Sequence, residues 1–98
     1  MLYLSFGLLS QVLHAFKYRD RTTIVSDVLK TVKDSRRGMR KTQIMQSANL
    51  NYIQTKKYLN YLLNYGFLVV TERDIYVITE KGARYLQLIE MYRIHNVR

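Results

Sequence analysis

The sequence contains no cysteine, which excludes disulfide bonds and thiolate chemistry. Its two histidines, His14 and His95, lie near opposite ends of the chain with no further ligand residues clustered beside them, so we expect no metal site. Carboxylates are also few, and beyond residue 34 they are limited to Glu72, Asp74, Glu80 and Glu90. Because no nucleophile with a base and no paired carboxylates are visible, we expect neither catalysis nor a cofactor.

Linker-like stretches are absent as well, and 98 residues leave room for one domain with one modest hydrophobic core. Hydrophobic residues make up 48% of the chain and nine residues are tyrosine, which is enough apolar surface to offset chain entropy. The sequence therefore predicts a folded domain.

The shortage of acidic residues leaves a large positive charge. Sixteen Lys and Arg residues stand against seven Asp and Glu, for a formal net charge of +9, and the basic residues are densest between Lys17 and Lys41. An excess of this size on a small surface is typical of proteins with an anionic partner. Composition alone leaves open nucleic acid, a membrane surface or a generically basic protein.

Residues 2–16 form an apolar segment without any charge. It is short for a membrane span, which needs about 20 apolar residues, and it lacks the features of a secretory signal. We expect a helix that covers the domain's own core or packs on a second subunit; a membrane-surface anchor and a misassigned start codon are the alternatives. The apolar stripe of this helix is Leu2, Phe6, Leu9, Leu13 and Phe16.

Three further helices are expected before the chain becomes rich in β-forming residues. Apolar positions at a 3.6-residue period predict a helix over residues 21–34, which ends before a turn at Gly38. A short helix follows from Arg40 or Lys41 to Ala48. The next helix runs from Tyr52 to Tyr65, with Asn51 and Gln54 forming a capping box at its start and Gly66 ending it.

The remaining chain predicts a β-hairpin and a last helix. Residues 67–71 and 75–78 are rich in β-branched and aromatic side chains and flank a polar loop, while Thr79 reads as the N-cap of a helix with Ala83, Leu86, Ile89 and Tyr92 on one face. This order predicts a mainly α fold with a small β-hairpin (α+β). It is the order of a winged helix-turn-helix domain, here over residues 17–98, with an extra helix over residues 1–16.

Six stretches stand in an order and spacing that point to one family. They are Lys41-Thr42-Gln43-Ile44-Met45, Leu50-Asn51-Tyr52, Lys56-Lys57-Tyr58-Leu59, Leu62-Leu63, Gly66-Phe67-Leu68 and Thr79-Glu80-Lys81-Gly82. With them, residues 17–92 resemble the small archaeal winged-helix proteins that occur as chromatin-associated or regulatory dimers. The resemblance implies DNA binding, usually by a homodimer joined through its terminal helices.

Family members often continue the last helix into a long antiparallel coiled coil, whereas only about sixteen residues follow Gly82 here. We therefore expect the helix at residues 2–16 to supply the missing dimer surface, alone or against the last helix. The candidate interface residues are Leu2, Phe6, Leu9, Leu13, Phe16, Leu86 and Ile89.

The helix at residues 52–65 is the expected recognition helix, the one that enters the major groove and reads the bases. A helical wheel places Tyr52, Thr55, Leu59, Leu62 and Leu63 on its core side and leaves Ile53, Gln54, Lys57, Tyr61 and Asn64 on its open side. Because such helices read bases mostly with their N-terminal half, the candidates for base contact are Asn51, Ile53, Gln54 and Lys57. Gln54 has the alternative of serving only the capping box, and Ile53 that of packing at the helix rim.

The candidates for contact with the DNA backbone lie around this helix. The N-terminus of the preceding helix favours phosphate, the flanking Lys and Tyr side chains can donate to it, and Arg73 is the one basic residue in the expected wing tip. The set is Arg40, Lys41, Thr42, Gln43, Lys56, Tyr58, Tyr61 and Arg73.

The function expected from these features is binding of double-stranded DNA in the cytoplasm, on the nucleoid, as a transcriptional regulator. Two alternatives stay open at this point: a sequence-tolerant chromatin protein, and a winged-helix module that contacts other proteins.

Overall fold

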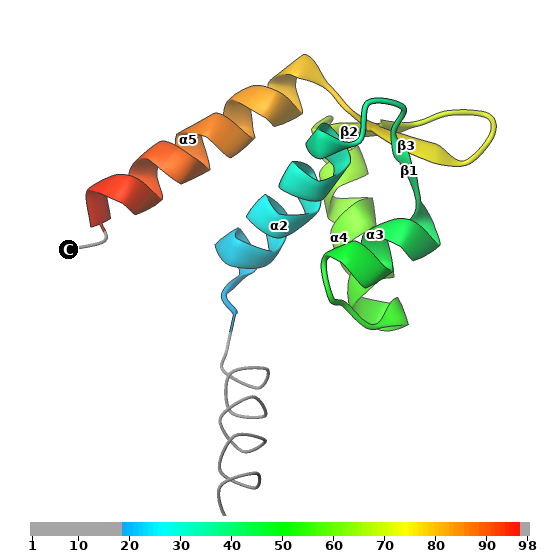
Figure 1. Ribbon diagram of the computed structural model, residues 1–98, viewed down its shortest axis with the longest axis horizontal. Helices are drawn as coiled ribbons and strands as arrows, with labels where there is room; N and C mark the ends of the chain where they lie inside the picture. The colour runs from blue at the N-terminus through cyan, green and yellow to red at the C-terminus, as the bar shows by residue number, and fades with distance from the viewer. Residues whose placement is uncertain (1–18, 97–98) are drawn as a thin grey trace, which may run out of the picture.

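The computed structural model describes residues 19–96, which form four α-helices and a small antiparallel sheet (Figure 1). The elements follow in the order α2 (Arg21–Asp34), β1 (Met39–Arg40), α3 (Lys41–Ser47), α4 (Tyr52–Asn64), β2 (Leu68–Val70), β3 (Ile75–Ile78) and α5 (Glu80–Asn96). The expected mainly α fold with a β-hairpin is confirmed. None of these helices is long and apolar enough to cross a membrane.

Helix α2 is the central element of the core. Asp20 caps its start by accepting a hydrogen bond of 2.8 Å from the backbone N–H of Thr23. Its apolar face packs against α3, β3 and α5, and every side chain of that face is at most 5% exposed. The residues are those of the expected stripe, Ile24, Val25, Val28, Leu29 and Val32.

The sheet has three strands in the order β1-β3-β2, one more than the expected hairpin. Met39 pairs with Tyr76 and Arg40 with Ile75, so β1 joins the open edge of β3. Gly38 makes the turn into β1 with a φ of +85°, as expected, and a Cβ atom there would come within 2.6 Å of the Tyr76 carbonyl oxygen. Because β1 holds the hairpin on its second edge, the wing is anchored to the loop that precedes α3.

Three residues do not lie where they were expected. Tyr52 was assigned to the core side of its helix but is 56% exposed, because it lies at the edge of the buried face of α4 and not at its centre. Leu86 and Ile89, expected at a dimer interface, are 1% and 6% exposed and belong to the protein's own core against α2. The other candidate interface residues, Leu2, Phe6, Leu9, Leu13 and Phe16, lie outside the described residues.

Candidate nucleic-acid interface

The start of α4 is held by the expected capping box. The Oδ1 atom of Asn51 accepts a hydrogen bond of 2.7 Å from the backbone N–H of Gln54, and the Oε1 atom of Gln54 accepts one of 3.1 Å from the backbone N–H of Asn51. Two donors that the helix itself cannot pair are thereby satisfied. The first turn of α4, where reading helices meet base edges, is therefore fixed by its own sequence.

The end of α4 is fixed by a Schellman motif. The N–H of Phe67 donates to the Leu62 carbonyl at 2.9 Å and the N–H of Gly66 to the Leu63 carbonyl at 3.1 Å, with Gly66 at a φ of +76°. This confirms Gly66 as the residue that ends the helix.

The Thr79-Glu80-Lys81-Gly82 stretch completes that end of α4. The Thr79 hydroxyl donates to the Gly66 carbonyl at 2.7 Å and accepts from the N–H of Gly82 at 2.9 Å, which makes it the expected N-cap of α5. The Nζ atom of Lys81 donates to the Tyr65 carbonyl at 2.8 Å. The start of α5 and the end of α4 therefore form one hydrogen-bonded junction.

Between its two fixed ends, α4 exposes one stripe to solvent. Opposite the buried side chains of Thr55, Leu59 and Leu62, the exposed residues recur at intervals of three and four positions. Ile53 is 77% exposed, so the alternative that it packs at the rim of the helix is not supported. The stripe consists of Ile53, Lys57, Asn60 and Asn64.

Asn60 was missed by the sequence reasoning. Its signal was present, because a wheel centred on the buried positions of α4 points Asn60 outward, about 20° from Ile53. Gln54, by contrast, is half-buried, and its Oε1 is occupied by the capping box. A bidentate pair with adenine needs both Oε1 and Nε2, so Oε1 would have to accept from adenine N6 as well as from the Asn51 N–H.

The start of α3 lies beside the first turn of α4. The Oε1 atom of Gln43 accepts from the backbone N–H of Arg40 at 2.9 Å, and Thr42 and Gln43 are exposed. The Nζ atom of Lys41 lies 5.0 Å from the centroid of the exposed Tyr52 ring, so a cation and an aromatic face stand together at the edge of the stripe.

The wing is a tight hairpin whose loop is Glu72–Asp74. The N–H of Asp74 donates to the Thr71 carbonyl at 3.0 Å, Asp74 adopts a φ of +63°, and the N–H of Thr71 donates to the Ile75 carbonyl at 2.9 Å. This is the three-residue loop with a left-handed last residue that right-twisted hairpins favour. Arg40 reaches the wing, because its Nη1 donates to the Arg73 carbonyl at 3.4 Å, and the Arg73 side chain is exposed.

The two candidate tyrosines of α4 face the protein instead of the stripe. Tyr58 is 8% exposed and belongs to the hydrophobic core. The ring centroid of Tyr61 lies 4.7 Å from that of Tyr65. The pKa of Tyr61 is raised above its ordinary value, first by burial and then by the nearby Tyr85 and Tyr65. We therefore leave both tyrosines out of the DNA-facing surface.

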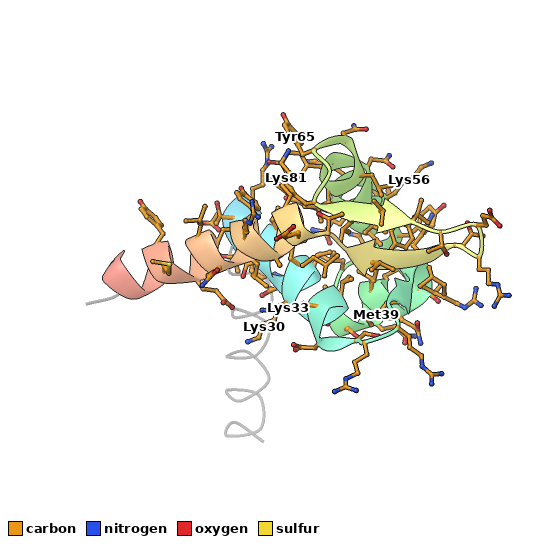
Figure 2. The ribbon with its side chains drawn as sticks, turned by 90° about the horizontal axis from the view of Figure 1, so that it is seen from above. Lys30, Lys33, Met39, Lys56, Tyr65 and Lys81 are labelled. Carbon is orange, nitrogen blue, oxygen red and sulfur yellow. The ribbon has the colours of Figure 1, made fainter. Side chains whose placement is uncertain are left out.

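The exposed basic residues lie on two sides of the molecule. Figure 2 shows Lys56 on the side opposite Lys30 and Lys33. Among the described residues, ion pairs join Arg19 to Asp27 and Arg84 to Glu80, and none of them involves the basic residues of α3, α4 or the wing. The same described residues contain no cluster of three or more potential metal ligands. Four basic side chains thus lie around the stripe, Arg40, Lys41, Lys56 and Arg73, and a fifth, Lys57, belongs to it.

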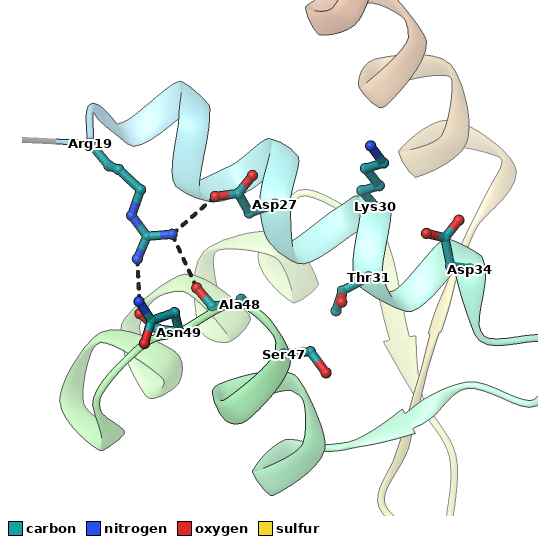
Figure 3. A pocket seen from close by; sticks show the side chains of 8 residues that line it. All are labelled: Arg19, Asp27, Lys30, Thr31, Asp34, Ser47, Ala48 and Asn49. Carbon is teal, nitrogen blue, oxygen red and sulfur yellow. Dashed lines mark hydrogen bonds and ion pairs between the residues drawn. The ribbon is translucent and has the colours of Figure 1, made fainter. Parts of the chain in front are cut away.

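A hollow of about 350 Å³ lies behind this surface, between α2 and the turn that joins α3 to α4 (Figure 3). Its lining includes Arg19, Asp27 and Asn49. The guanidinium of Arg19 contacts both Asp27 and the turn, a contact that sequence reasoning missed because it joins positions about thirty residues apart.

A short helix, a turn of a few residues, a second helix and a three-stranded wing define a winged helix-turn-helix domain. Residues 18–96 match the family described as winged helix-turn-helix, and the chain belongs to that family. Two archaeal relatives come from Methanocaldococcus jannaschii. MJ0290 is 38% identical to this chain over 72 residues, which cover 74% of this chain and 33% of MJ0290. MJ0287 is 29% identical over 79 residues, which cover 80% of this chain and 78% of MJ0287. The chain thus spans a third of the length of MJ0290.

Two solved structures are similar to the chain. Sso10a-2, a DNA-binding protein from Sulfolobus solfataricus, is 34% identical with a TM-score of 0.66, over 76% of this chain and 78% of that protein. A Listeria innocua protein of unknown function has a TM-score of 0.64 over 91% of this chain and 68% of its own, but only 14% identity, so it supports the fold alone.

Proposed function

We propose that this chain binds double-stranded DNA as a transcriptional regulator, by inserting the exposed stripe of α4 into the major groove. The observation that carries the proposal is the stripe itself. It places an apolar residue that is 77% exposed, Ile53, next to the Lys57 ammonium and the Asn60 amide on one face of a helix capped at both ends. A major groove about 12 Å wide admits a helix of this kind.

Each residue of the stripe suits a different group on a base edge. Ile53 would contact a thymine methyl, Lys57 guanine O6 and N7 or a phosphate, and Asn60 adenine N6 and N7. Asn51 and Gln54 remain candidates for base contact, because the capping box leaves other polar groups available, such as Nε2 of Gln54. Each good base contact is worth about 1–3 kcal/mol of discrimination, so two or three of them give a measurable sequence preference.

Phosphate contacts are assigned to the rim of the stripe. Arg40, Lys41, Lys56 and Arg73 lie there, with Thr42 and Gln43 as neutral donors, and Lys57 of the stripe is the fifth basic side chain that can reach a phosphate. If all five bind phosphates, log K falls with log salt at a slope of about −4.5 for one protomer, since each contact contributes about −0.9. The similarity to Sso10a-2, whose name describes it as DNA-binding, supports the same partner.

The test is a titration of random and selected duplexes across salt concentrations. We expect salt-dependent binding, with Lys57→Gln reducing the slope by about 0.9 and Ile53→Ala reducing preference among duplexes at an unchanged slope. Lys33→Gln is the matched control, because it removes one exposed charge from the opposite side (Figure 2). Wild-type protein that binds no duplex, or Lys33→Gln and Lys57→Gln that behave alike, would contradict the proposal.

A sequence-tolerant chromatin protein is the second candidate, and the net charge of +9 favours it. Such a protein binds selected and random duplexes with nearly equal affinity, whereas specific binders gain about 10³-fold or more over non-specific sites. The same titration therefore separates the two roles, which share a cytoplasmic, nucleoid-bound location.

We also propose a homodimer, with its contact moved from Leu86 and Ile89 to the outer face of α5. Leu88, Met91 and Tyr92 are 62%, 51% and 67% exposed there. Leu88→Lys should shift the protein toward monomer in sedimentation equilibrium, while Gln87→Lys, at an adjacent exposed position, should not. A dimer that survives Leu88→Lys unchanged would assign the interface to another surface.

A further inference from the structure

Arg19 connects the start of α2 with the turn of the helix-turn-helix. Its Nη1 atom donates to the Ala48 carbonyl at 3.1 Å and its Nη2 atom to the Asn49 carbonyl at 2.9 Å (Figure 3). The same Nη1 atom lies 3.0 Å from Oδ2 of Asp27, in the second turn of α2. The planar guanidinium thus joins one carboxylate and two backbone carbonyls at once.

The two carbonyls lie beyond the reach of the α3 hydrogen-bond ladder. The last turns of α3 pair the carbonyls of residues 44–46 with the backbone N–H groups of residues 48–50. The carbonyls of Ala48 and Asn49, which follow in the turn, accept from Arg19. A cation at the C-terminal end of a helix is also favoured by the helix dipole.

The turn held in this way sets where α4 begins. Asn49 adopts a φ of +57°, a conformation that costs a non-glycine residue free energy and needs surrounding contacts to hold it. Asn51, two residues later, is the N-cap of α4, and Ile53 follows it. A rotation at Asn49 would therefore swing the first turn of α4 relative to the rest of the domain.

We propose that Arg19 and Asp27 form a clamp that positions the N-terminal half of α4 for DNA. Arg19 is thus a positioning residue that acts through the turn and needs no contact with DNA itself. This inference rests on the proposed DNA binding. Without the clamp, water reaches the two carbonyls through the adjoining hollow, so the fold persists while the turn loses its restraint.

Asp27→Asn gives the sharpest test, because loss of the clamp and removal of a negative charge change the affinity for DNA in opposite directions. Removing a negative charge should tighten DNA binding by simple electrostatics. Loss of the clamp should weaken it by roughly tenfold, the size expected for one charge-assisted contact. Asp34→Asn is the matched control: Asp34 lies on the same helix and lines the same hollow, but the described ion pairs do not include it. It should bind as tightly as wild type or more tightly.

Arg19→Lys is the second variant, since it keeps the charge but loses the planar fork. We expect weaker binding by roughly tenfold with an unchanged salt slope, whereas loss of a phosphate contact lowers the slope by about 0.9. Hydrogen exchange in residues 48–54 should become faster in Asp27→Asn and Arg19→Lys, and stay at the wild-type rate near the Schellman end of α4.

The exchange measurement makes the two proposals separable. If wild-type protein binds no duplex, the proposed function fails, and exchange alone decides whether the clamp exists. If Asp27→Asn and Asp34→Asn bind and exchange alike, the clamp is refuted while DNA binding stands. Thermal unfolding of each variant confirms that binding is measured on folded protein.

Discussion

Gly82 lies in the first turn of α5, where the start of that helix meets the end of α4. A Cβ atom at this position would come within 2.1 Å of the Phe67 carbonyl oxygen and 2.9 Å of Cγ1 of Ile78. The carbonyl cannot rotate away, because it belongs to the backbone and also accepts from Thr79. Gly82→Ala must therefore push α5 and the wing apart by about 1 Å, and overpacking of this kind typically costs about 1–3 kcal/mol.

The sign of the stability change in Gly82→Ala distinguishes steric overlap at the junction from ordinary helix propensity. In an exposed helix, alanine is favoured over glycine by about 1 kcal/mol, so propensity alone predicts that Gly82→Ala stabilises. We expect instead a net loss of about 2 kcal/mol, which lowers the Tm by roughly 8–16 °C for a domain of this size. Differential scanning calorimetry and urea denaturation measure it.

Gly66→Ala is the comparison variant. A Cβ atom there meets nothing closer than Cδ of Lys81 at 4.0 Å, but the φ of +76° makes a side chain strained. We expect a cost of about 1–2 kcal/mol from the backbone conformation alone. A Gly82→Ala protein that is as stable as wild type would refute the account of the junction, because no relaxation short of moving α5 removes the overlap.

Three further predictions concern the same scaffold. Asn51→Ala removes the cap of α4 and should lower the free energy of unfolding by about 1 kcal/mol in urea denaturation. Thr79→Val loses the hydroxyl that donates to Gly66 and accepts from Gly82, and should cost about 1–3 kcal/mol in the same assay. Because the folded state raises the pKa of Tyr61 above 10.0, its contribution to stability is complete below that pH and is lost as the pH rises through the raised pKa. Tyr61→Phe should therefore make the urea midpoint fall less steeply above about pH 10; an equal fall in both proteins contradicts this assignment.

The helices could be predicted because each carries a repeating apolar face and recognisable ends. Asn51, Gly66 and Thr79 cap helices through partners a few residues away, so these roles were visible in sequence, whereas the bond from Thr79 to Gly66 spans thirteen positions and was not. Strand β1 has only two residues, which is too short for any periodicity to register, and it forms only because β3 offers an open edge.

The interface was less predictable, because exposure depends on neighbours that a helical wheel does not contain. The wheel placed Tyr52 inward, but the described neighbours leave it 56% exposed at the edge of the buried face of α4. In sequence, an apolar face on α5 is equally consistent with packing in the core and with a dimer interface. In the structure, α2 packs on that face and buries Leu86 and Ile89 in the core. Arg19 contacts Asn49 across thirty positions, and a single sequence carries no trace of that pairing.

The placement of β1 also bears on how the wing can change over evolution. Since β3 is flanked on both sides and Arg40 contacts the loop backbone, altering the strands would disturb the segment that leads into α3. The exposed side chains of residues 72 and 73 are free of that constraint. New contacts can therefore be acquired at the tip by point substitution without redesigning the domain, and replacing Glu72 with a basic residue is a practical first step in engineering a tighter binder.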